Sequence, residues 1–213
     1  IGHVSAKQVN EVSAWLAQLT RDNVLPQKMF VLHQFQRQMI RDRDEVRTDH
    51  PELATVIHVD GQGTLLTTEE CLLNPNRNPT LSRGQIESLL ARYLGVRKII
   101  WLSRGVFNDE TDGHVDNLCC FVRAGEVVLT WCDDPADPQY DISRAAYEVL
   151  RTARDSRGKQ LKINKLLQPG PLYMTAAEAA GIEAAPGSRV RRAGERLAGS
   201  YVNFYIATRH VVM

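Results

Sequence analysis

Hydrophobic and polar positions over residues 56–102 follow a pattern of short strands and one amphipathic helix. The predicted order is strand, strand, helix, strand, over residues 56–59, 64–67, 82–95 and 96–102. Asp60-Gly61 between the first two runs is typical of a hairpin turn. Ser82 and Gln85 have the spacing of a helix capping box, and Gly95 can end the helix in a left-handed conformation.

The same order then recurs. The second set of predicted elements comprises strands at 118–122 and 127–131, a helix that Asp141 caps and Gly158 stops, and a strand at 161–167. A third unit starts with a strand at 201–206, a turn at 207–209 and a partner strand from Val211, so we expect the chain to be part of something longer. Each unit has too small a core to be stable alone, so several must pack together.

The first 55 residues do not follow this order of strand, strand, helix and strand. They predict a helix with an apolar stripe over residues 5–19, a buried strand over 29–35 and a charged connector over 36–45. We therefore divide the chain into an N-terminal segment, 1–55, and a repeat domain, 56–213.

The long connections follow the last strand of each unit, at 103–117 and 168–200. The first ends in His114 and Asp116, and on an extended strand residues two apart point to the same face. Asp109, Glu110 and Asp112 stand just upstream. This cluster suits a cationic, hydrogen-bonding substrate, and a solvated acidic loop and a divalent-metal site are the alternatives.

Composition narrows the class of protein. The 213 residues are 43% hydrophobic and 24% charged with a net charge of +1, which is ordinary for a globular domain and points to no nucleic-acid or membrane partner. No apolar run reaches membrane-spanning length, and no secretion signal is visible. Cys71, Cys119, Cys120 and Cys132 form no CxxC pair and no disulfide pattern, so we expect core thiols and a cytoplasmic protein.

Several long motifs resemble agmatine deiminases of bacteria and plants. The motifs are Ile57–Gly61, Thr64–Pro79, Asn108–Asn117, Gln168–Tyr173 and Gly199–Phe204, in that order, and the resemblance runs from Val56 to Met213. It implies an α/β protein with a partial pentein fold (an α/β-propeller) built from ββαβ units, which in that family number five around a pseudo-fivefold axis.

The resemblance also implies a reaction, the hydrolysis of agmatine to N-carbamoylputrescine and ammonia through a cysteine thiolate, with no metal and no other cofactor. His114 is then the general acid and base, and Asp116 a carboxylate that holds the guanidinium. Asp112 and Glu110 are candidate substrate-binding carboxylates. These residue types fit the chemistry, because carboxylates match the paired donors of a guanidinium and histidine moves protons near neutral pH.

Two departures from the family pattern stand out. The family's nucleophile lies in a Gly-Gly-Gly-Asn-x-His-Cys segment that we expect beyond Met213. The family's Glu-Gly-Gly segment is replaced here by Leu53-Ala54-Thr55, with Glu52 one residue out of register. Residues 1–55, through Leu25–Phe35, resemble instead a secreted bacterial cell-wall-associated family with a hydrolase-like domain.

Three hypotheses remain open on sequence grounds. The first is an incomplete agmatine-deiminase-type enzyme that is inactive alone, and the second is a non-catalytic α/β module that binds guanidinium cations. The third is a metal-assisted hydrolase that uses His114, Asp116 and Asp112. The unpaired strand edges of an open repeat also lead us to expect self-association into homo-oligomers.

Overall fold

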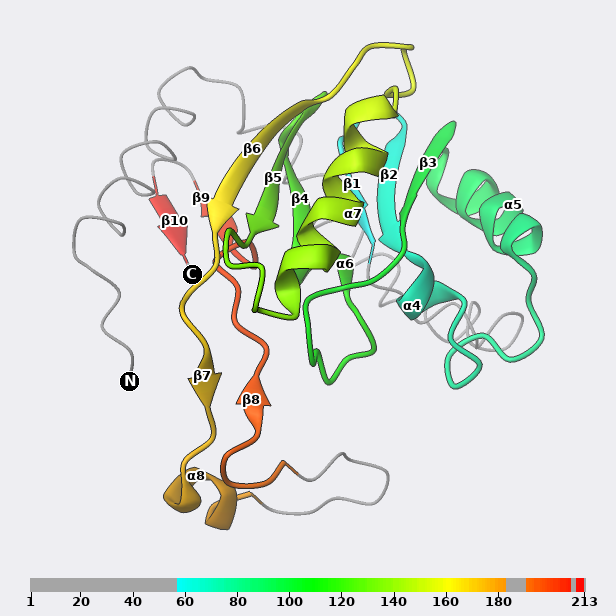
Figure 1. Ribbon diagram of the computed structural model, residues 1–213. Helices are drawn as coiled ribbons and strands as arrows, with labels where there is room; N and C mark the ends of the chain where they lie inside the picture. Colours follow the sequence, from blue (N-terminus) through cyan, green and yellow to red (C-terminus); the bar gives the residue numbers. More distant parts are fainter. Residues whose placement is uncertain (1–56, 183–190, 208–209, 213) are drawn as a thin grey trace.

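The computed structural model describes residues 57–182, 191–207 and 210–212, so the helix and the strand expected within residues 1–55 lie outside the described residues. Figure 1 shows two three-stranded sheets side by side, a helix lying across them, and an arm that extends away from this body. The two sheets correspond to the first two units expected from the sequence.

The first unit has the predicted order. Strands β1 (His58–Val59) and β2 (Thr64–Thr68) pair antiparallel, and β3 (Lys98–Leu102) joins β2 in parallel. The short helix α4 (Glu69–Leu72) and helix α5 (Arg83–Leu94) connect β2 to β3. The Ser82–Gln85 capping box forms, and Gly95 ends α5 with a φ of 64°, so both helix boundaries are confirmed.

The second unit repeats this arrangement. Strands β4 (Cys119–Arg123) and β5 (Glu126–Trp131) pair antiparallel, and β6 (Lys162–Leu167) joins β5 in parallel after helix α7 (Gln139–Thr152). The expected limits of the helix were wrong. The helix begins at Gln139, before Asp141, after a turn in which Asp137 accepts the Gln139 N–H at 2.8 Å. Gly158 belongs to a later turn in which its N–H donates to the Asp155 carbonyl.

One core joins the two units. Leu66, Ile100 and Leu102 of the first unit pack with Leu129 and Leu150 of the second. Helix α7 contacts β3 as well as β5 and β6, so it bridges both sheets (Figure 1).

The two adjacent cysteines of β4 point to opposite faces of the strand. Cys119 packs into the core that joins the two units, whereas Cys120 packs with Val122, Val128 and Val202. This arrangement confirms the expectation that neighbouring strand residues alternate.

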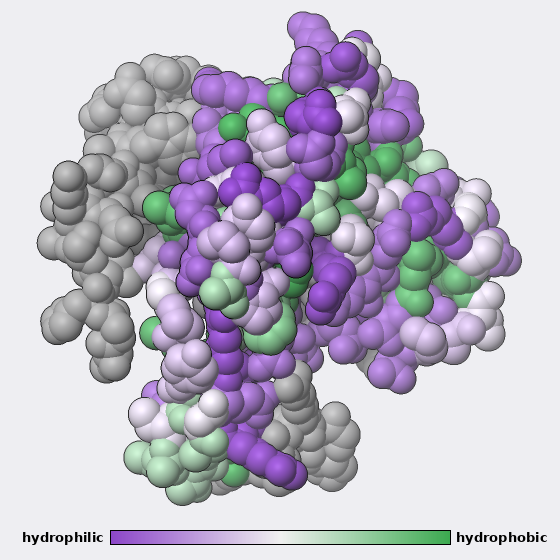
Figure 2. Space-filling model, in the orientation of Figure 1, coloured by the Kyte–Doolittle hydropathy of each residue, from purple (hydrophilic) through white to green (hydrophobic). Residues whose placement is uncertain are grey.

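The second long connection forms an arm rather than an irregular loop. Strands β7 (Leu172–Tyr173) and β8 (Arg196–Leu197) pair antiparallel, and helix α8 (Ala176–Ala180) lies at the tip (Figure 1). Figure 2 shows apolar residues gathered over α8 at that tip, on a face that is otherwise largely hydrophilic. Thr175 and Glu178 form a capping box at the start of α8, a local signal that the sequence analysis overlooked.

The start of a third unit is present. Strands β9 (Tyr205–Ala207) and β10 (His210–Val212) pair antiparallel, which confirms a hairpin with a shorter first strand than expected. Over the described residues, the helices are too short or too polar to cross a membrane.

Candidate active site

The first long connection, residues 103–114, is held against the start of α4. Glu70 accepts the Gly105 N–H at 2.8 Å, and the Thr68 hydroxyl donates to the Gly113 carbonyl at 2.5 Å. A Cβ on Gly113, whose φ is 77°, would lie 2.5 Å from Glu70 Oε2. Glycine is therefore favoured at position 113, because its left-handed φ would strain any other residue and a side chain there would force the Glu70 side chain to move.

Asp109 shapes the end of this connection. One of its carboxylate oxygens accepts the Thr111 N–H and hydroxyl at 2.9 and 2.6 Å. The other accepts the His114 N–H at 3.2 Å and the Asn117 amide at 3.1 Å. The chain therefore turns at this point, and the turn leads into a short helix, α6 (Val115–Leu118).

This turn corrects the conformation expected for the His114–Asp116 pair. His114 is the residue before α6 and Asp116 lies in its first turn, so the two are not on an extended strand. The structure still brings their side chains together, with His114 Nδ1 4.0 Å from Asp116 Oδ1. The reason is local: the hydrogen bonds to Asp109 favour a helical turn over an extended strand.

The pair sits in a partly buried environment, with side chains 19% (His114) and 35% (Asp116) exposed. Burial lowers the pKa of His114 from its ordinary value, an effect that Asp116 opposes and Arg77 reinforces. Burial likewise raises the pKa of Asp116, and His114 opposes that shift. Asp116 Oδ1 is buried and has no hydrogen-bond partner among the described residues.

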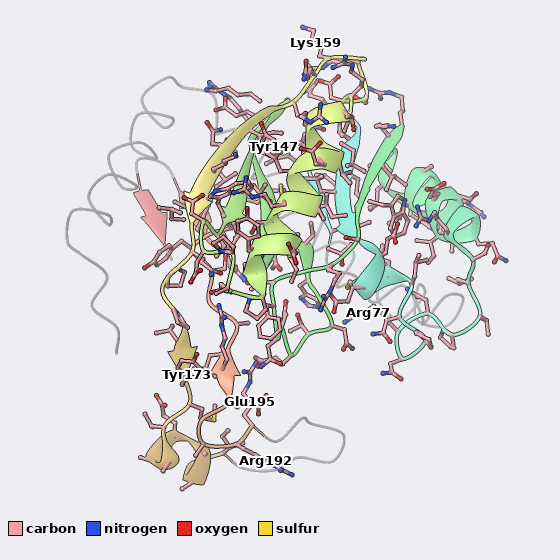
Figure 3. All side chains as sticks on the ribbon, viewed as in Figure 1. Arg77, Tyr147, Lys159, Tyr173, Arg192 and Glu195 are labelled. Atoms are coloured by element: carbon pink, nitrogen blue, oxygen red, sulfur yellow. The ribbon has the colours of Figure 1, made fainter. Side chains whose placement is uncertain are left out.

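A third side chain, Arg77, completes the cluster. It comes from the connection between α4 and α5, and its Nη2 lies 3.3 Å from His114 Nε2 and 3.1 Å from the Thr111 carbonyl oxygen. In Figure 3 it lies beside the connection that leads to α6. Arg77 lies in the motif Thr64–Pro79, but its role could not be predicted from the sequence, because no spacing rule links residues 37 positions apart.

The remaining predicted site residues are placed differently. Glu110 forms an ion pair with Arg191 of the arm, and Asn108 donates to the Arg196 carbonyl at 2.6 Å. Asp112 is exposed and adopts a φ of 60°, and its charge acts on the pKa of His114. The structure thus groups His114, Asp116 and Asp112, while Glu110 is engaged with the arm.

All four cysteines are free and buried. Burial raises the pKa of Cys119, Cys120 and Cys132. No group of three or more His, Cys, Asp or Glu side chains within the described part of the chain is arranged to hold a metal ion, so the metal-assisted alternative gains no support.

Comparison with known proteins identifies the fold and the family. The family model of Porphyromonas-type peptidyl-arginine deiminases matches residues 10–213. An agmatine deiminase of Pseudomonas fluorescens is 57% identical over 156 residues, which are 73% of this chain and 42% of that protein. A relative from Shewanella frigidimarina is 52% identical over 193 residues, 90% of this chain and 50% of that one.

A solved structure gives the same result. The agmatine deiminase of Enterococcus faecalis superposes with a TM-score of 0.65 at 42% identity, covering 70% of this chain and 40% of that one. The two ββαβ units and the third hairpin are thus parts of a pentein fold. The chain spans half or less of the length of these relatives.

These matches bear on the N-terminal segment as well. The family match begins at residue 10, and the likeness of residues 1–55 to a cell-wall-associated family therefore has no support. The division of the chain at residue 55 stays a prediction. From the family match, the related sequences and the shared pentein units together, we conclude that the chain belongs to the Porphyromonas-type peptidyl-arginine deiminase family.

Proposed function

We propose that the chain carries the guanidinium-binding and proton-transfer part of an agmatine-deiminase-type active site. The reaction is the hydrolysis of agmatine to N-carbamoylputrescine and ammonia. The observation that carries this proposal is Asp116 Oδ1, a buried carboxylate oxygen without a hydrogen-bond partner among the described residues, 4.0 Å from His114 Nδ1. The agmatine deiminase names of the related proteins support the choice of substrate.

A guanidinium group suits this environment. It is planar and always charged, and it presents N–H donors that match a carboxylate. Asp116 offers the unpaired oxygen, and exposed Asp112 adds negative charge nearby. Because Glu110 pairs with Arg191, we assign Glu110 to holding the arm rather than to direct substrate contact.

The proposed chemistry has two halves. In the first, His114 takes the proton of a cysteine thiol, and the thiolate sulfur forms a bond to the guanidinium carbon. His114 then gives this proton to the departing nitrogen, which leaves as ammonia, so that a covalent amidino intermediate remains.

In the second half, a water molecule attacks the same carbon and gives a proton to His114. The carbon–sulfur bond breaks and the thiolate leaves with the electron pair. The hydroxyl proton that remains from the water passes to the solvent, and N-carbamoylputrescine is released. The proton held by His114 returns to the thiolate, so the enzyme ends in its starting state.

The thiolate in this scheme comes from outside the four cysteines of the chain. Each of the four is buried, and a thiol whose pKa is raised by burial is a poor nucleophile near neutral pH. We infer that the nucleophile is supplied by the family's Gly-Gly-Gly-Asn-x-His-Cys segment. The 213-residue chain alone should then release no measurable ammonia from agmatine. If the chain does release ammonia and His114→Ala abolishes that release, one of the four cysteines acts as the nucleophile.

A chemical-shift titration tests the binding part. Agmatine should perturb the resonances of His114, Asp116 and their neighbours with a dissociation constant on the order of millimolar. Putrescine, which has an amine in place of the guanidinium, should perturb them much less at equal concentration. Equal responses to the two ligands, or no response around His114, would contradict the proposal.

A further inference from the structure

The side chain of Arg77 makes two contacts that join it to the proposed proton-transfer residue. Its Nη2 donates to the Thr111 carbonyl at 3.1 Å and lies 3.3 Å from Nε2 of His114. Thr111 and His114 belong to the same turn, which Asp109 stabilises. Arg77 thus contacts both the backbone that carries the imidazole and the imidazole itself.

The chemistry of a guanidinium decides the direction of the second contact. A guanidinium has only N–H donors and no acceptor, and it stays protonated in proteins. Nε2 of His114 must therefore accept, which places the proton of the neutral imidazole on Nδ1. That nitrogen is the one that faces Asp116 Oδ1 at 4.0 Å.

We propose that Arg77 is a positioning residue for His114, which fixes the tautomer whose Nδ1–H faces Asp116 by donating a hydrogen bond to Nε2. The inference deepens the proposed function, since it rests on His114 as the residue that moves protons. Arg77 itself contacts neither the reacting carbon nor the sulfur in this scheme.

The charges around His114 give Arg77 a second effect. Three aspartates, Asp109, Asp112 and Asp116, favour the imidazolium, whereas burial and the positive charge of Arg77 oppose it. A proton that arrives on Nε2 also ends the hydrogen bond from Arg77. Arg77 therefore makes His114 give up such a proton more readily, which suits a group that must protonate a departing nitrogen.

Nuclear magnetic resonance of the 213-residue chain tests this inference without substrate. The imidazole ¹⁵N shifts report the tautomer of His114, and their pH dependence gives its pKa. For the unaltered chain we expect the Nδ1–H tautomer and a pKa below 6.5. In Arg77→Met the tautomers should mix, and the pKa of His114 should rise because a nearby positive charge has been removed.

Two further variants separate positioning from simple support of the fold. Arg77→Lys keeps the charge and a donor, so it should restore most of the low pKa of His114. Arg83→Met is the matched control, because Arg83 pairs with Glu69 and lies over Trp101, and its loss should leave His114 unchanged. If Arg77→Met does not fold, Arg77→Gln removes the charge while keeping N–H donors and tests the same pKa shift.

An Nε2–H tautomer in the unaltered chain would overturn the proposal. A pKa of His114 that is the same in Arg77→Met and Arg77→Gln as in the unaltered chain would also overturn the proposal. Because these readings need no agmatine, their failure is distinguishable from a failure of the proposed reaction, which the agmatine titration decides.

Discussion

His58 makes the stability of the protein depend on pH in a way that the structure predicts. Its Nδ1 accepts the backbone N–H of Phe121 at 3.2 Å and so links β1 of the first unit to β4 of the second. An accepting Nδ1 requires an imidazole that carries no proton on that nitrogen. Burial lowers the pKa of His58 from 6.5 to about 4, so the ring is neutral in the folded protein at pH 7.

The size of the effect follows from the two pKa values. In the unfolded chain His58 takes up a proton as the pH falls through 6.5, whereas in the folded chain it does so only near 4. The contribution of neutral His58 to the free energy of unfolding is therefore fully present above pH 6.5, and it is lost as the pH falls from 6.5 to about 4. At roughly 1.4 kcal/mol per pH unit, the loss is at most about 3 kcal/mol.

Urea denaturation of the unaltered chain and of His58→Asn between pH 7 and pH 4 measures this loss. The asparagine side-chain oxygen can accept the Phe121 N–H but does not titrate. The difference in unfolding free energy between the two proteins should stay constant above pH 6.5 and then move in favour of His58→Asn as the pH falls. Other titrating groups cancel in the difference, so a difference that is flat down to pH 4 would refute the reasoning.

Three other substitutions test the surroundings of the site. Gly113→Ala should destabilise the fold by about 2 kcal/mol or more in urea denaturation, because its φ of 77° and the proximity of Glu70 both oppose a side chain. Gly84→Ala, in the open first turn of α5, should instead stabilise by about 0.5 kcal/mol, and equal losses in both variants would contradict this account. Glu110→Gln should leave agmatine affinity within about twofold while hydrogen exchange in β7 and β8 becomes faster, since it removes the carboxylate that pairs with the buried guanidinium of Arg191. A large loss of affinity in Glu110→Gln would place this carboxylate in the binding site.

Much of the fold could be predicted because its signals are local. The capping box at Ser82 and the left-handed Gly95 act within one turn of helix, so a short stretch of sequence is enough to locate them. The opposite faces of Cys119 and Cys120 follow from the geometry of any strand. The ββαβ order emerged because each unit carries the same sequence of such signals.

The site itself was less predictable. The identities of His114 and Asp116 could be proposed, but their conformation depends on hydrogen bonds to Asp109 that compete with an extended strand. The contact of Arg77 with His114 joins distant parts of the chain, so no periodicity indicates it. The ion pair that occupies Glu110 likewise depends on how the arm folds back.

The most direct test of the central claim is a calorimetric titration of agmatine into the unaltered chain, Asp116→Asn and Asp141→Asn. Asp141 is an exposed aspartate of α7 and serves as the matched control. The account predicts a binding free energy on the order of 4 kcal/mol for the unaltered chain and for Asp141→Asn. It predicts about a tenfold weaker affinity for Asp116→Asn, because a charge-assisted hydrogen bond to the guanidinium is lost. Equal affinity for all three proteins would contradict the claim that Asp116 holds the guanidinium group.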